Sequence, residues 1–182
     1  MDGKNIFGST FESGEPGSLP SKARMRSIIA EHPFLRGMSS EHLAILAEDA
    51  MPLHFDVDEV IFRKGDPANR FYLIVHGKVQ LEAEANHHAT LPIQPIGDGD
   101  VLGWSWLVPP YLWQFDARAL EPTRAIFFYG TPLREECETN HDLGYELLKR
   151  MSEVMIKRLQ ATREELIESR RHGNLQPMRR RG

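Results

Sequence analysis

The residues best suited to chemistry lie in one stretch, residues 99–120. It begins with glycines and acids, continues into a short aromatic run at 103–107, and ends in a segment that alternates polar and apolar residues. A glycine turn followed by a brief helix and a strand can bind an anion, because free backbone N–H groups at the helix start point outward together. All three tryptophans of the chain also lie here, at positions 104, 106 and 113.

Catalytic chemistry has little support elsewhere in the sequence. None of the eight histidines lies two residues from another, the spacing that would bring alternate strand residues of a jelly-roll barrel to one metal. His87 and His88 are adjacent, so they would point in opposite directions on a strand or would both lie in a turn. No nucleophile elbow, P-loop or CxxC pair occurs. A cupin-like metal-dependent enzyme is therefore the weakest hypothesis, and we expect no catalytic or metal-binding residues and no enzyme.

Composition and charge set broad limits. The chain has 182 residues, 41% hydrophobic and 26% charged, which fits one soluble domain with an ordinary core. A net charge of −4 gives no global basic field for nucleic acid. There is no apolar run of membrane-spanning length and no signal-peptide core, and Cys137 is the only cysteine, so we expect a cytoplasmic protein. The carboxylates around Cys137 disfavour its thiolate and a nucleophilic role.

Two helices are predicted ahead of the strands. Residues 1–20 contain several Gly, Ser and Pro residues and no apolar periodicity, which predicts a disordered lead-in. Ser21 is a good N-cap for a helix to about Glu31, which Pro33 stops. Ser39 is a good N-cap for a second helix to about Ala50.

From residue 51 the pattern changes to short strands separated by turn signals. The predicted strands cover residues 53–55, 59–62, 71–76, 78–84, 90–96, 114–120 and 123–129. Many short strands with glycine turns and no helix between them indicate an antiparallel sandwich or barrel.

Helices return after Gly130. Thr131 followed by Pro132 predicts the start of a short helix to about Thr139, and a long helix follows from Asn140 to about Arg171. The apolar surface of the long helix is wider than one stripe, and near-heptad spacing relates Leu148, Met151, Met155, Leu159, Thr162 and Leu166. This spacing favours pairing with the same helix of a second copy, across a two-fold axis. The alternative is that the whole stripe packs on the helix's own barrel.

In this order the segments resemble the cyclic-nucleotide-binding domains of Crp/Fnr-type regulators and cyclic-nucleotide-dependent kinases. The matching segments are His32-Pro33-Phe34-Leu35, residues 38–46, residues 60–66 and 70–79, the glycine turn Gly99-Asp100-Val101-Leu102-Gly103 and residues 157–162. The resemblance covers about residues 27–168. It implies a mostly β fold with flanking helices, a double-stranded β-helix (jelly roll) over 51–130. Helices are expected over 21–50 and 131–171, including the long C-terminal helix, and a basic tail over 172–182.

The resemblance also implies where a ligand would bind. In the family a glutamate after the second cassette glycine binds the ribose hydroxyl, an arginine at the end of the cassette pairs with the cyclic phosphate, and a threonine on the long helix meets the base. The corresponding residues here are Trp104, Trp113 and Thr162. A hydrogen bond to a charged group contributes about 1.5–3 kcal/mol, so both substitutions count against binding of cyclic AMP or cyclic GMP.

The predicted ligand-binding residues are Gly103, Trp104, Ser105, Trp113, Gln114, Arg118 and Thr162. Arg118 would restore a positive charge if its side chain entered the pocket, but alternation alone leaves its face open. An Asp116–Arg118 pair on the outer face is the slightly favoured alternative.

Two functional hypotheses remain open at this point. In the first, the domain is a sensor whose rebuilt pocket binds a cyclic nucleotide or another small aromatic or apolar molecule by stacking. In the second, the rings fill the pocket and the domain is a protein–protein interaction module. Both expect a homodimer through the long helix and a downstream protein partner. We expect no membrane association and no direct sequence-specific DNA binding, because the chain ends without a helix-turn-helix.

Overall fold

A computed structural model of the chain describes residues 21–86 and 89–173. The chain divides into two compact units, Met1–Glu146 and Leu147–Gly182. The lead-in predicted for residues 1–20 and most of the basic tail predicted for 172–182 lie outside the described residues, as do His87 and His88.

The described part of the first unit contains eight strands in two four-stranded antiparallel sheets, with the orders β1-β8-β3-β6 and β2-β7-β4-β5. The strands are β1 (Met51–Phe55), β2 (Val60–Phe62), β3 (Arg70–His76), β4 (Val79–Asn86), β5 (Ala89–Ile96), β6 (Val101–Leu102), β7 (Asp116–Ala119) and β8 (Thr123–Tyr129). The predicted jelly roll is confirmed.

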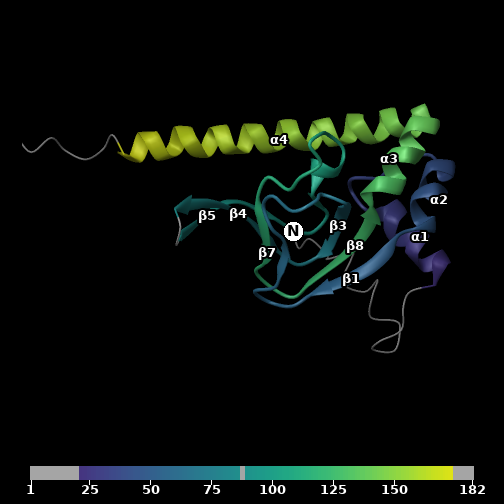
Figure 1. Cartoon of the computed structure of the whole chain (residues 1–182), viewed down its shortest axis with the longest axis horizontal. Helices are drawn as coiled ribbons and strands as arrows, with labels where there is room; N and C mark the ends of the chain where they lie inside the picture. The colour runs from purple at the N-terminus through teal and green to yellow at the C-terminus, as the bar shows by residue number, and fades with distance from the viewer. Residues whose placement is uncertain (1–20, 87–88, 174–182) are drawn as a thin grey trace, which may run out of the picture. The chain divides into compact units, whose positions relative to one another are not determined.

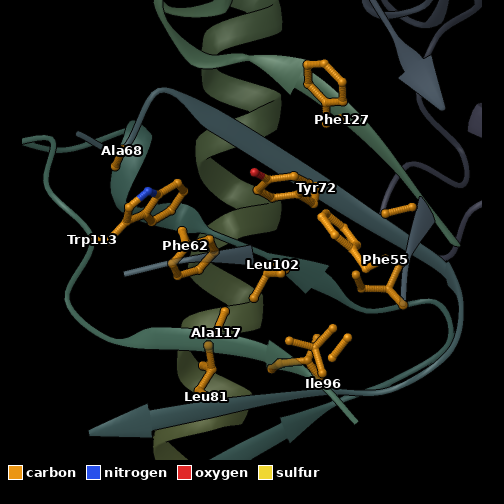
Figure 2. Close-up of a cluster of buried hydrophobic side chains, with 14 residues drawn as sticks. Phe55, Phe62, Ala68, Tyr72, Leu81, Ile96, Leu102, Trp113, Ala117 and Phe127 are labelled. Carbon is orange, nitrogen blue, oxygen red and sulfur yellow. The ribbon is translucent and has the colours of Figure 1, made fainter. Parts of the chain in front are cut away.

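The core lies between the inner faces of the two sheets. Alternation along each strand turns every second side chain inward, and register places Tyr72 of β3 opposite Phe127 of β8. On the other sheet Leu81 of β4 pairs with Ala117 of β7. Figure 2 shows the resulting cluster, which includes Phe55, Phe62, Ala68, Tyr72, Ile74, Leu81, Ile96, Leu102, Trp113, Ala117, Ala119 and Phe127.

The helices α1 (Lys22–Glu31) and α2 (Ser40–Glu48) begin at the predicted N-caps. The hydroxyl of Ser21 accepts a hydrogen bond from the N–H of Arg24, and Ser39 does the same for His42, both at 3.2 Å. Figure 1 shows α1, α2 and α3 (Gly130–Thr139) gathered at one end of the two sheets.

Several boundaries differ from the predictions by one or two residues, and three differences are larger or concern a whole element. Strand β6 was not predicted, because its two residues are too short for a periodic pattern. Strand β7 is shorter than the predicted 114–120. The predicted Thr131 cap is wrong, since α3 begins at Gly130, whose N–H donates to the carbonyl of Asn69 at 2.8 Å.

The helix α4 (His141–Gly173) runs from the first unit into the second. Its first turn is capped by Asn140, whose side-chain oxygen accepts the N–H of Leu143 at 3.1 Å. In the second unit several large apolar side chains are exposed, led by Leu159 at 71%; the others are Leu148, Ile156, Leu166 and Ile167. None of the described helices is long and apolar enough to cross a membrane.

Candidate ligand-binding site

The glycine frame of the cassette is a tight turn held against β3. The N–H of Asp100 donates to the carbonyl of Gly97 at 3.0 Å, and the N–H of Gly99 donates to the carbonyl of Ile74 at 2.8 Å. Gly99 has a φ of +80°, and a Cβ there would lie 2.9 Å from the Pro33 ring. Glycine is required at this position by both conformation and space.

Gly103 is the last glycine of the cassette turn, and the ring of Trp113 packs directly against it. It has a φ of +84°, and an added Cβ would lie 2.7 and 2.8 Å from two ring atoms of Trp113. The helical segment after it, η1, is a single 3-10 turn, Trp104–Trp106. The structure therefore brings Gly103 and Trp113, two predicted site residues, into contact.

Trp113 belongs to the barrel core. Its ring is 4% exposed and stacks on Phe62, with the ring centroids 3.9 Å apart and the planes 10° from parallel. Its backbone is fixed as well, because its N–H donates to the carbonyl of Asp66 and its carbonyl accepts the N–H of Gly65. Figure 2 shows the Trp113 ring beside Phe62. The end of the cassette is thus closed by a well-packed aromatic pair.

The other residues of the aromatic run have different environments. Trp104 is half-buried, whereas Ser105 and Trp106 are buried. Helix α3 holds this turn, because Arg134 donates to the carbonyl of Trp106 at 2.6 Å and to the hydroxyl of Thr131 at 3.0 Å. The Arg134 guanidinium also lies 4.3 Å from the ring centroid of Tyr111. The cassette is fixed from outside the barrel by this arginine.

Strand β7 turns its charges away from the barrel. Ala117 and Ala119 are fully buried in the core, so Arg118 and Asp116 lie on the opposite face. The favoured outer-face alternative is therefore confirmed, but the expected Asp116–Arg118 pair is wrong.

The partners of these charges come from other strands and loops. Arg118 forms an ion pair with Glu82 at 3.5 Å and donates to the carbonyl of Asp58 at 2.9 Å. Asp116 accepts the N–H of Lys64 at 2.7 Å. Neither charge is available to the interior of the barrel.

The remaining predicted residues are spread out. Gln114 is exposed and its amide nitrogen donates to the carbonyl of Leu112 at 3.0 Å. Thr162 is exposed on the part of α4 that belongs to the second unit. The ligand-binding roles assigned from the sequence to these residues, and to Gly103, Trp104, Ser105, Trp113 and Arg118, remain predictions.

One buried and one half-buried titratable group are neutral at physiological pH. Burial lowers the pKa of His32 from 6.5 to about 4, against the opposing effects of its hydrogen bond to the Ile74 carbonyl and the charge of Asp100. Its Nε2 lies 3.2 Å from that carbonyl oxygen. Burial also raises the pKa of Cys137 to about 11, with a smaller contribution from Glu136. Its thiol is therefore a poor nucleophile, as the sequence indicates.

A separate cavity of about 150 Å³ opens between α2, β8 and α3. None of the residues predicted from the sequence lines it; the lining residues are Ile45, Leu46, Glu48, Asp49, Phe128, Tyr129, Pro132, Leu133 and Glu136. Among the residues that the structure describes, no group of three or more His, Cys, Asp or Glu side chains could hold a metal ion.

Residues 52–140 match the family model of the cyclic nucleotide-binding domain, so this part of the chain belongs to that family. A CRP-like cAMP-activated global transcriptional regulator of Mycobacterium tuberculosis is 24% identical over 144 residues, covering 79% of this chain and 62% of that protein. A cAMP-dependent protein kinase regulatory subunit of Dictyostelium discoideum is 35% identical over 72 residues, covering 38% of this chain and 22% of that protein.

Among solved structures, a putative cyclic nucleotide-binding protein from Geobacter metallireducens is 27% identical, with a TM-score of 0.66. The match covers 77% of this chain and 98% of that one. The predicted family is confirmed, and the named curated relatives are regulators of transcription and of a kinase. The chain spans less than two thirds of the length of either curated relative.

Arg70, whose backbone lies close to the cassette, is not among the site residues predicted from the sequence. Its carbonyl oxygen lies 3.5 Å from the position of an added Cβ on Gly103. The signal was present in the alternation of β3, where Arg70 shares a face with the core residues Tyr72 and Ile74.

Proposed function

We propose that this chain is a non-enzymatic regulatory domain of the cyclic-nucleotide-binding type that acts without binding cyclic AMP or cyclic GMP. The observation that carries the proposal is the position of Trp113. Its ring stacks on Phe62 and contacts Gly103, at the end of the cassette where the family resemblance places the phosphate-binding arginine.

Two free-energy costs of binding a cyclic nucleotide support this proposal. Moving Trp113 out of its core position to admit a phosphate would cost about 3–5 kcal/mol, as judged from the loss of large aromatic side chains in protein cores. The phosphate would also lack a charge-assisted hydrogen bond that contributes about 1.5–3 kcal/mol. Together these terms weaken binding by a factor of about a thousand or more relative to an intact cassette.

The regulatory output is assigned to α4 of a homodimer. Leu148, Leu159 and Leu166 are exposed, and their spacing places them along one side of the helix. Exposed large apolar side chains in a row are typical of an interface. A second copy of the same helix would cover them, and an unidentified protein partner would detect the state of this pair.

The proposal is tested by calorimetric titration of the wild-type chain with cyclic AMP and cyclic GMP. We expect no saturable heat up to about 1 mM of either nucleotide, which corresponds to a binding free energy weaker than about −4 kcal/mol. Micromolar binding that disappears in Thr162→Ala would overturn the proposal and support a nucleotide-binding sensor.

The dimer is tested by light scattering on two variants that introduce the same charge at adjacent positions. Leu159→Glu places a carboxylate on the apolar row and should shift the population from dimer to monomer. Gln160→Glu places it on an exposed neighbouring position and should leave the dimer intact. A wild-type chain that is monomeric at high concentration, or a dimeric Leu159→Glu variant, would contradict the homodimer.

A further inference from the structure

The inner face of β3 carries one positive charge. Tyr72 and Ile74 belong to the barrel core, and Arg70, two residues before Tyr72, lies on the same side of the strand. The backbone carbonyl of Arg70 lies beside Gly103, so β3 begins next to the cassette.

Arg70 contacts aromatic groups there. Its guanidinium carbon lies 5.0 Å from the ring centroid of Phe127. Burial raises the pKa of the Tyr72 hydroxyl, and the nearby Arg70 guanidinium partly opposes that effect. Phe127 in turn meets Tyr129 edge-on, with the centroids 5.2 Å apart. Phe127 is buried, whereas Tyr129 is 43% exposed, so the group reaches from the core to the surface.

The Arg70 side chain is half-buried, and no carboxylate of the described residues forms an ion pair with it. Arginine carries five N–H donors in a planar fork, more than the one neighbouring hydroxyl of Tyr72 could accept. A guanidinium at the edge of an apolar interior attracts an anion more strongly than one in bulk water, because the local dielectric is lower. The remaining donors therefore form a recognition element for an anion.

We propose that Arg70, Tyr72, Phe127 and Tyr129 form a binding site for an organic anion that carries a flat ring. The carboxylate or sulfonate group binds the Arg70 guanidinium, and the ring packs on the exposed Tyr129. The site takes its charge from β3 and needs nothing from Trp113 or Arg118. This inference goes beyond the proposed function and does not depend on it.

The test uses two probes that share a ring and differ in charge, indole-3-acetate and indole-3-acetamide. Calorimetry on the wild-type chain should show the carboxylate binding about tenfold or more tightly than the amide, because only the carboxylate forms charge-assisted hydrogen bonds. Equal affinities would overturn the proposal. So would the absence of saturable carboxylate binding up to about 10 mM, where a ring and one charged contact should already be detected.

Single-residue variants test whether Arg70 causes the preference for the carboxylate. Arg70→Gln should remove the preference for the carboxylate, Arg70→Lys should retain part of it, and the exposed Arg63→Gln should retain all of it. Tyr129→Ala should weaken both probes by the same factor, because it removes a ring contact and no charge. A carboxylate preference that survives in a folded Arg70→Gln variant, checked by its melting temperature, would contradict the assignment.

The outcome is separable from that of the cyclic nucleotide titration. Micromolar binding of cyclic AMP that is unchanged in Arg70→Gln would overturn the proposed function and leave the acid–amide comparison to decide the Arg70 site. Equal affinities of the wild-type chain for the acid and the amide, with no binding of cyclic AMP, would overturn the Arg70 site and leave the proposed function in place.

Discussion

Strands β3 and β7 each present one face to the barrel interior, and they distribute charge in opposite ways. On β7 the inward residues Ala117 and Ala119 are small and apolar, and Arg118 faces outward to Glu82. On β3 the inward row of Tyr72 and Ile74 begins with Arg70, whose guanidinium lies over the Phe127 ring.

The difference shows how the same fold can place its interior charge on either of two strands. Trp113, just before β7, closes the cassette end, and the charge that follows it is used on the outer face. The positive charge that faces the interior comes from β3 instead. The proposed anion site accordingly uses the β3 side, whereas the inward residues of β7 belong to the packed core.

The largest expected effect comes from removing the ring that closes the β7 side. Trp113→Ala should lower the free energy of unfolding by about 3–5 kcal/mol, because it deletes a buried ring stacked on Phe62. Urea denaturation monitored by circular dichroism measures this change. Trp104→Ala is the matched control and should cost distinctly less, since Trp104 is half-buried. Equal losses in the two variants would show that Trp113 is not a special packing residue.

A smaller effect on stability is expected from His32, whose ring contacts the Ile74 carbonyl of β3. The pKa of His32 is about 4 in the folded chain, below its ordinary value of 6.5, so the unfolded chain takes up a proton that the folded chain refuses. This contribution to stability is complete above pH 6.5 and is lost as the pH falls to about 4. The loss should reach about 3 kcal/mol, at 1.36 kcal/mol per pKa unit.

Urea denaturation at several pH values between 6.5 and 4 measures this loss, and His32→Asn isolates it from the carboxylates that titrate in the same range. The variant should be less stable at pH 7, because the contact with the Ile74 carbonyl is altered. The difference between wild type and variant should then shrink as the pH falls. A difference that stays constant with pH would show that His32 is not the group responsible.

The smallest effect compares the two arginines directly. Arg118→Gln should cost about 1 kcal/mol of stability, because it breaks a partly buried ion pair and leaves the mostly buried Glu82 carboxylate without its partner. Arg70→Gln should cost less, since it removes one cation–π contact and no ion pair. Thermal denaturation of both variants measures the order. A reversed order would indicate that Arg70 is the structural residue of the two.

Much of this arrangement could be predicted from the sequence. The serine caps at Ser21 and Ser39, the strand rhythm and the glycine turn at Gly99 are local signals, and the structure agrees with them. The roles of Trp104 and Trp113 are not local. Trp113 is buried and Trp104 only half-buried, because hydrogen bonds hold the backbone of Trp113 to the turn at Gly65 and Asp66. Sequence spacing does not reveal these hydrogen bonds.

The ion-pair partners of the charged residues could not be predicted from the sequence either. Alternation predicts that Arg118 and Asp116 share a face, but the Glu82 partner follows from the register between β4 and β7. The same alternation placed Arg70 with Tyr72, and only the packing of Phe127 shows that this face is the interior.

The most direct test restores the two substituted cassette positions and measures cyclic AMP binding by calorimetry. If Trp113 and Trp104 are the reason that the cassette does not bind the nucleotide, the Trp104→Glu/Trp113→Arg variant should bind it about tenfold or more tightly than the wild-type chain. The wild-type chain should show no saturable heat up to about 1 mM. Micromolar binding by the wild type, or a folded double variant that binds no better, would contradict the closure of the cassette by Trp113.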